Sequence, residues 1–136
     1  MENFFEMNMD RNQINAISNL GLAHIGDGVF ELLCRSYLCA AGGKNVGNLH
    51  KQTVAMVKAP SQARFADKLV PVLTEEELAS YKKKKNSHVH AVPKGATPSA
   101  YAKATGLEAL FGALYLSGQT QRLNQLFHIM IEETEG

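Results

Sequence analysis

Two acidic residues stand inside otherwise apolar helical segments. Asp27 lies within residues 22–30 (LAHIGDGVF), and Glu108 lies within residues 107–112 (LEALFG). An ionised carboxylate in such a position must be paired, hydrogen-bonded or bound to a metal, because burying it alone costs too much free energy. These two acids are therefore the first candidates for chemistry.

The residue types alone leave two interpretations of these acids open. In the first, Asp27 and Glu108 each pair with a buried base, for which Arg35 and His24 are available. In the second, the acids lie on neighbouring core helices and share a divalent cation, for which Mg²⁺ is suited because it prefers oxygen ligands.

Three glycines accompany the two acids. Gly26 and Gly28 flank Asp27, and Gly112 follows Glu108 by one helical turn. Each glycine costs a helix roughly 1 kcal/mol relative to alanine. We expect this cost to be offset by close approach of two helices, or by room for a bulky ligand beside the carboxylates.

The elements that must position the acids are predicted to be helices. Alternating strand patterns are scarce, whereas alanine, leucine, lysine and glutamate are plentiful. Apolar periodicity and end signals predict helices at about 20–41, 46–58, 60–71, 75–85, 98–117 and 121–133. Thr74 and Glu77 form a predicted capping box, and residues 86–97 form a loop. The prediction is a single all-α domain at 20–136, preceded by an extension at 1–19 that could hold a short helix.

Composition excludes several classes of protein. The chain of 136 residues is 45% apolar and 20% charged, which fits one domain with a proper core. No apolar run approaches the ~20 residues of a membrane span, and the acidic start lacks the features of a signal peptide. We therefore predict a cytoplasmic protein without membrane association. Cys34 and Cys39 are five apart, on different helix faces, and are expected to be two reduced, buried thiols.

The charge distribution is uneven although the net charge is only +1. Residues 44–103 carry a local charge of +7, and the remainder carries −6. One face could thus attract a polyanion while the whole chain stays near neutral.

The most basic segment is the run of Lys82, Lys83, Lys84 and Lys85, followed by Asn86, Ser87 and, further on, Lys94. These residues form a solvated helix end, or they hold the phosphates of a nucleic acid. His50 and Lys51 are further candidates, with His50 either touching phosphate or capping its helix. His88 and His90 lack further zinc ligands nearby, and zinc is not favoured.

The residues around the two acids resemble two motifs of the ribonuclease III family. The first family motif carries an acid-x-x-x-Asp pattern within EFLGDAV, and residues 24–29 (HIGDGV) match its core. The second family motif reads D-x-x-E-A-L on a later helix, and residues 108–112 (EALFG) match it. The order of the helices and the spacing of about eighty residues between the motifs also fit.

More specifically, the chain resembles the Mini-ribonuclease III subgroup, which has the endonuclease domain without a double-stranded-RNA-binding domain. Residues 22–32, 49–51 (LHK) and 92–94 (VPK) carry this resemblance, which extends over residues 20–131.

Two positions depart from the family pattern. Ala23 stands where the first motif has its glutamate, and Thr105 stands where the second has its aspartate. Of about four acids per site in the family, only Asp27 and Glu108 match.

The resemblance implies hydrolysis of phosphodiesters in double-stranded RNA. Asp27 and Glu108 would be catalytic residues that hold Mg²⁺, with Mn²⁺ able to substitute, and water would fill the remaining octahedral positions. Glu31 lies one turn after Asp27, on the same helix face. It either supports the residues that hold the metal, or it is an acid on the surface or in an ion pair. Family members are homodimers whose signature helices form the interface. The subgroup implies a 23S ribosomal RNA precursor as substrate, with a ribosomal protein as an additional partner.

The missing acids motivate an alternative. The chain could be a non-catalytic helical dimer that binds structured RNA and has lost nuclease activity; a metal-free helical adaptor is a third interpretation. Only the enzyme loses cleavage, and not folding, when Asp27 or Glu108 is neutralised.

Overall fold

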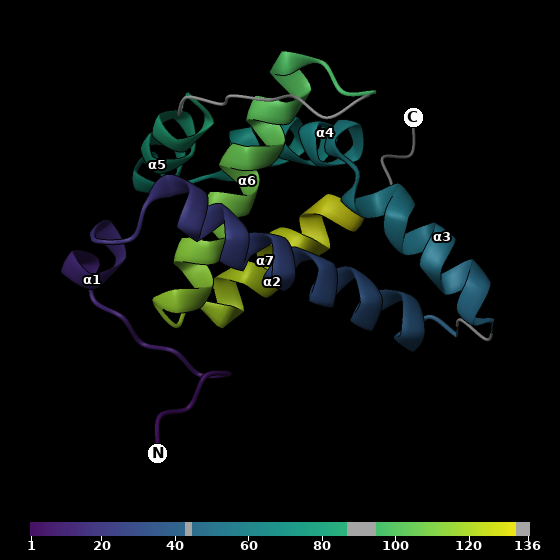
Figure 1. Ribbon diagram of the computed structural model, residues 1–136, viewed down its shortest axis with the longest axis horizontal. Coiled ribbons are helices and arrows are strands. Elements are labelled where there is room, and N and C mark those ends of the chain that lie inside the picture. Colours follow the sequence, from purple (N-terminus) through teal and green to yellow (C-terminus); the bar gives the residue numbers. More distant parts are fainter. Residues whose placement is uncertain (43–44, 87–94, 133–136) are drawn as a thin grey trace.

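The computed structural model describes residues 1–42, 45–86 and 95–132, and these parts of the chain form helices and no strand (Figure 1). The all-α prediction is confirmed. The helices are α1 (Arg11–Asn15), α2 (Asn19–Ala40), α3 (Val46–Val57), α4 (Ala59–Leu69), the 3₁₀ turn η1 (Val70–Val72), α5 (Glu75–Lys85), α6 (Pro98–Leu116) and α7 (Thr120–Ile131). None of these helices is long and apolar enough to cross a membrane.

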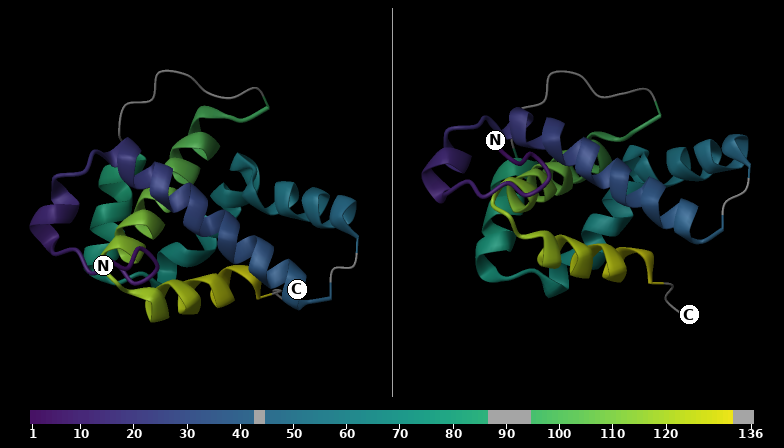
Figure 2. Two further views of the ribbon diagram at one scale, coloured as in Figure 1. Left: turned by 60° about the horizontal axis from the view of Figure 1, so that its bottom comes forward. Right: turned by 90° about the horizontal axis from the view of Figure 1, so that it is seen from below.

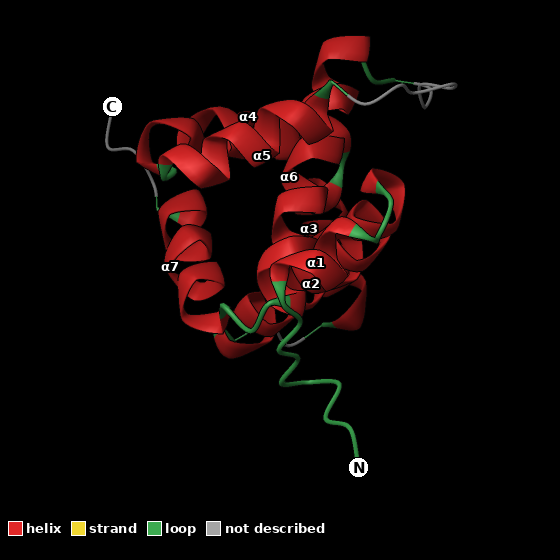
Figure 3. Ribbon diagram, turned by 90° about the vertical axis from the view of Figure 1, so that its left-hand side faces the viewer, coloured by secondary structure: helices red, strands yellow, loops and turns green. Residues whose placement is uncertain are grey.

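Helix α6 is the centre of the molecule. It packs against α2, α4, α5 and α7; in the side view of Figure 3, α6 runs from the top downwards, with α4 and α5 beside its upper part and α7 to its left. Its buried residues point in all directions around the helix, as expected for a helix enclosed by others. Helix α3 lies at the edge of the molecule, where it contacts α2 and α4 (Figure 2).

The main core lies between α2, α4, α6 and α7. Phe30 of α2 is fully buried, and its ring lies 5.9 Å from that of Phe111 on α6 and 6.1 Å from that of Phe65 on α4. Leu126 and Phe127 of α7 close the core on another side. Burial of these large apolar side chains is the main source of stability for the fold.

Helix α2 crosses α6 with the two backbones in direct contact. A Cβ added to Gly26 would lie 1.5 Å from the carbonyl oxygen of Glu108, and one added to Gly112 would lie 2.0 Å from that of Leu22. Only glycine fits at these two positions, so close helix approach is confirmed as their role. Gly28 is different, because an added Cβ there would meet nothing within 4 Å.

Short polar side chains set the helix ends. Ser18 accepts a hydrogen bond from Gly21 N at 3.0 Å, and Thr97 accepts one from Ala100 N at 3.1 Å. The capping box of Thr74 and Glu77 is confirmed, with both of its hydrogen bonds formed. Glu77 also forms a two-pronged ion pair with Arg122 of α7, which ties α5 to α7 and lowers the pKa of Glu77.

The N-terminal segment is part of the fold. Met7 is buried against the end of α6, and Met9 N donates a hydrogen bond to Leu116 O at 2.8 Å. Gly118 ends the turn after α6 with a φ of +79°, and a Cβ added there would lie 2.7 Å from Met7 O. The predicted short helix of the extension is α1.

The prediction for the cysteines is half wrong. Cys34 is buried, and burial raises the pKa of its thiol to about 12. Cys39 is exposed, because it lies near the end of α2 beyond the covering helices. Both are free thiols, as predicted.

We predict that Gly26→Ala and Gly112→Ala each destabilise the fold by at least about 3 kcal/mol, because the added methyl group forces the α2 and α6 backbones apart. Gly28→Ala is the matched control on the same helix and should raise stability by about 0.5–1 kcal/mol. Urea unfolding of the three variants measures these effects. Equal stability changes at Gly26 and Gly28 would contradict the close crossing.

Candidate active site

The crossing of α2 and α6 brings the two predicted acids together. Gly26 lies against the backbone of Glu108, and Asp27 is the next residue. The carboxyl group of Asp27 is near enough to that of Glu108 to raise its pKa through hydrogen bonding and charge, which favours a proton on Glu108 when no cation lies between the two groups. The two acids thus lie on neighbouring helices, as the second of the two interpretations expected.

The environment of the two carboxyl groups is unequal. Glu108 is half-buried, whereas Asp27 is exposed, so the expectation that both lie in the core is wrong for Asp27. Burial is the largest cause that raises the pKa of Glu108 from 4.5 to about 8, followed by the hydrogen bond and the charge of Asp27. Hydrogen bonding by Gln62 lowers the pKa of Glu108 and opposes these effects in part.

No base compensates this pair of acids in the parts of the chain that the structure describes. Arg35 is exposed and pairs with Glu31, with 3.1 Å between Nη2 and Oε2, and His24 is exposed. The four ion pairs found there do not include Asp27 or Glu108. The interpretation of the acids as members of buried ion pairs with Arg35 or His24 is therefore wrong.

Among the residues that the structure describes, the site contains only these two acids. Among the described residues, no group of three or more histidine, cysteine, aspartate or glutamate side chains could hold a metal. Ala23 packs in a small core cluster with Ala109, and Thr105 is buried. Two adjacent carboxylates without a base nevertheless suit a hard divalent cation that keeps several waters, and this donor set fits Mg²⁺.

The lysine run does not form a single face. Lys82 and Lys83 are exposed, as is Asn86 at the end of α5. Lys84 is half-buried and donates a hydrogen bond to Ser80 Oγ, and the ammonium group of Lys85 lies 5.9 Å from the centre of the Tyr81 ring. Consecutive helical residues point in different directions, which separates these four cations.

The other predicted RNA-binding residues are divided. His50 and Lys51 are exposed on α3. Ser87, Lys94 and the two histidines of the loop lie outside the described residues. Helix α5 packs on α6 at Gly106, which lies nearly opposite Glu108 around α6.

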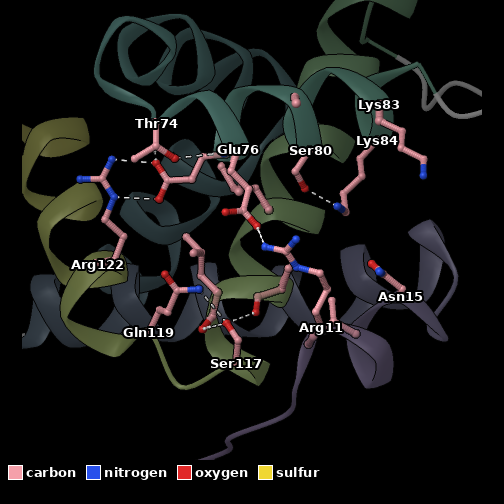
Figure 4. A pocket seen from close by; sticks show the side chains of 16 residues that line it. Arg11, Asn15, Thr74, Glu76, Ser80, Lys83, Lys84, Ser117, Gln119 and Arg122 are labelled. Atoms are coloured by element: carbon pink, nitrogen blue, oxygen red, sulfur yellow. Dashed lines mark hydrogen bonds and ion pairs between the residues drawn. The ribbon is translucent and has the colours of Figure 1, made fainter.

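A cleft of about 910 Å³ lies across α6 from the acids (Figure 4). Its wall on α6 consists of Leu110, Ala113, Leu114 and Ser117, which point away from Glu108 by helical geometry. Two of its cations are already paired, Arg11 with Glu76 and Arg122 with Glu77. The cleft is thus separate from the candidate site.

Gln62 is a residue near the site that sequence reasoning missed. It lies on α4, is only 2% exposed, and its amide group contacts the Glu108 carboxyl. A polar residue between buried Ser61 and Ala63 was the only local signal, and it did not indicate a partner on α6.

The chain is similar to known proteins over most of its length. A family model described as the ribonuclease III domain matches residues 20–119. A Mini-ribonuclease 3 of Symbiobacterium thermophilum is 40% identical over 107 residues, which cover 79% of this chain and 82% of that protein. A Mini-ribonuclease 3 of Thermoanaerobacter sp. is 38% identical over 120 residues, covering 88% and 84%. The crystal structure of a Fusobacterium nucleatum protein superposes with a TM-score of 0.78 at 34% identity, covering 85% of this chain and 94% of the other.

Because the pKa of Glu108 is raised, we predict that the free energy of unfolding of the metal-free protein depends on pH. Between pH 4.5 and about 8 the native state binds more protons at this carboxyl than the unfolded state does, so its contribution to stability falls as the pH rises. Glu108→Gln stays neutral, and in EDTA it should be more stable than the unchanged protein by about 1–3 kcal/mol at pH 8.

Urea unfolding at pH 5 and pH 8 checks this, with the exposed Glu132→Gln as the control that should follow the unchanged protein. A Glu108→Gln advantage that is the same at both pH values would contradict the assignment.

Proposed function

The chain belongs to the ribonuclease III family and is an endoribonuclease of that type, and we propose that it hydrolyses double-stranded RNA with Mg²⁺ held by Asp27 and Glu108. The observation that carries this proposal is the contact between two carboxyl groups, beside which the described part of the chain places no base. Such a pair gains most from a divalent cation, since the cation removes the repulsion that otherwise requires a proton.

The two acids would have different tasks. Asp27 is exposed and would hold the cation on the side open to RNA, and half-buried Glu108 would hold it from the side of the core. When bound, Mg²⁺ would polarise the scissile phosphate and make a water molecule a better nucleophile. Mn²⁺ has similar ligand preferences and can substitute. Glu31 remains a candidate for supporting the metal site from one turn away, although its ion pair with Arg35 is sufficient to explain it.

We further propose that exposed cations bind the RNA backbone. Lys82, Lys83 and Lys51 are exposed, and none of them takes part in the ion pairs of the described residues. Lys84, Lys85, Asn86, Ser87, Lys94 and His50 complete the proposed set. Lys84 and Lys85 contact neighbouring side chains and would contribute mainly through their charge.

The proposed assembly is a homodimer. Leu20 and Leu32 of α2 are 58% and 57% exposed, and they lie about 120° apart around the helix, at the two edges of the side that a second copy could cover. The family resemblance makes a 23S ribosomal RNA precursor the proposed substrate, in the cytoplasm, with a ribosomal protein as a further partner on that RNA.

Cleavage tests the proposed metal site. Asp27→Asn and Glu108→Gln should each lower the rate of cleavage of a ribosomal RNA stem by at least about 100-fold, while folding and RNA binding persist. Glu31→Gln on the same helix should lose far less. The assay is run with Mg²⁺ and with EDTA. Cleavage by Asp27→Asn at the rate of the unchanged protein would contradict the proposal. A folded protein that binds several duplexes but cleaves none with Mg²⁺ or Mn²⁺ would favour the non-catalytic binding dimer.

Salt dependence tests the proposed phosphate contacts. The double variant Lys82→Ala/Lys83→Ala should bind duplex RNA more weakly in EDTA, and its slope of log affinity against log salt should fall by about one for each lysine that had neutralised a phosphate. Arg11→Ala removes one positive charge from an existing ion pair and should change the slope less. Identical slopes for the double variant and the unchanged protein would exclude these lysines from the interface.

A further inference from the structure

Gln62 occupies a place where an apolar side chain would be expected. It lies in the second turn of α4, is 2% exposed, and is flanked by buried Ser61 and Ala63. A buried primary amide is costly unless its donors and acceptor find partners. Its presence therefore calls for a task that an apolar residue could not perform.

One side of the Gln62 amide is fixed to the corner between α3 and α4. Its Nε2 donates to the carbonyl oxygen of Val57, the last residue of α3, at 2.7 Å. Ser61 makes a parallel contact, with its Oγ donating to Ala55 O at 2.5 Å. Two buried side chains of α4 thus satisfy carbonyl groups that the end of α3 leaves free.

The other side of the same amide faces the active site. Helix α4 packs on α6, and the Gln62 amide lies near enough to the Glu108 carboxyl to lower its pKa by hydrogen bonding. Both neighbours of the amide nitrogen are hydrogen-bond acceptors, so the amide cannot flip without placing its oxygen against other oxygens.

The orientation of the Gln62 amide leaves its oxygen without a hydrogen bond in the part of the chain that the structure describes. Oε1 of Gln62 is buried and has no hydrogen-bond partner among the described residues. Leaving a buried acceptor unpaired is unfavourable, and the orientation persists because Val57 and Glu108 both require the donor. The Gln62 amide is thus oriented with its nitrogen towards Glu108, although this orientation leaves its own oxygen without a hydrogen bond to the described residues.

We propose that Gln62 is a positioning residue that holds the Glu108 carboxylate in the orientation in which it shares a divalent cation with Asp27. This inference rests on the metal site of the proposed function. A glutamate side chain has three rotatable bonds, and a carboxylate that ligates a cation must be held by other hydrogen bonds to keep its geometry. With only two acids in the site, the orientation of each matters more than it would in a site with four.

A purely structural role as a brace of the α3–α4 corner is the competing explanation. Ser61 separates the two explanations, because its hydroxyl braces the same corner and donates to Ala55 O, whereas the Gln62 amide also reaches Glu108. Ser61→Ala is therefore the matched control for loss of the corner hydrogen bond.

The test measures Mn²⁺ binding to the RNA-free full chain by titration calorimetry. Gln62→Met keeps the length of the side chain without its donor, and it should weaken Mn²⁺ binding about 10–100-fold, as expected for loss of a group that orients a metal ligand. Ser61→Ala should bind Mn²⁺ as the unchanged protein does. In cleavage assays, Gln62→Met should require a correspondingly higher Mg²⁺ concentration for half-maximal rate and recover most of the rate at saturation.

Unchanged Mn²⁺ affinity in Gln62→Met, or an equal loss in Ser61→Ala, overturns the proposal in favour of a corner brace. Circular dichroism establishes that each variant is folded, and Gln62→Leu, which is smaller, replaces Gln62→Met if the latter is not. Asp27→Asn identifies a failure of the proposed function itself: if Mn²⁺ binding survives that change, the metal lies elsewhere, whatever Gln62 does.

Discussion

The contact between the backbones of α2 and α6 is the constraint on which the rest of the structure depends. At Gly26 and Gly112 the two helices meet without side chains between them, and this proximity determines the distance between Asp27 and Glu108. The other helices then enclose α6 on its remaining sides. A single crossing thus sets both the centre of the core and the separation of the two acids.

Electrostatics at this crossing oppose folding of the metal-free chain. Two carboxyl groups lie together without a base, and one of them is partly removed from water. The buried carboxylate of Glu77, by contrast, is compensated by its ion pair with Arg122. The contrast supports a role for the acid pair that is not structural, because ordinary packing would have paired or removed these charges.

Features that depend on nearby residues were predictable from the sequence. The caps, the helix order and the two acids follow from short motifs, and the glycines beside the acids indicated a close crossing. Contacts between distant segments were not predictable. The second partner of Glu77 is 45 residues away, and Gln62 joins three helices through one amide. The exposure of Asp27 and the separation of the four lysines follow from helix rotation and from which faces other helices cover.

The segment that the ribonuclease III domain model matches is shorter than the segment that folds. The family match ends at residue 119, just before α7, and begins after α1. Yet Leu126 and Met130 of α7 belong to the main core, and Met7 covers the end of α6. A fragment trimmed to residues 20–119 would expose the apolar side of α6 to water. The cooperative unit of this protein therefore extends from the N-terminal segment to α7, and its limits are set by burial and not by the bounds of the domain match.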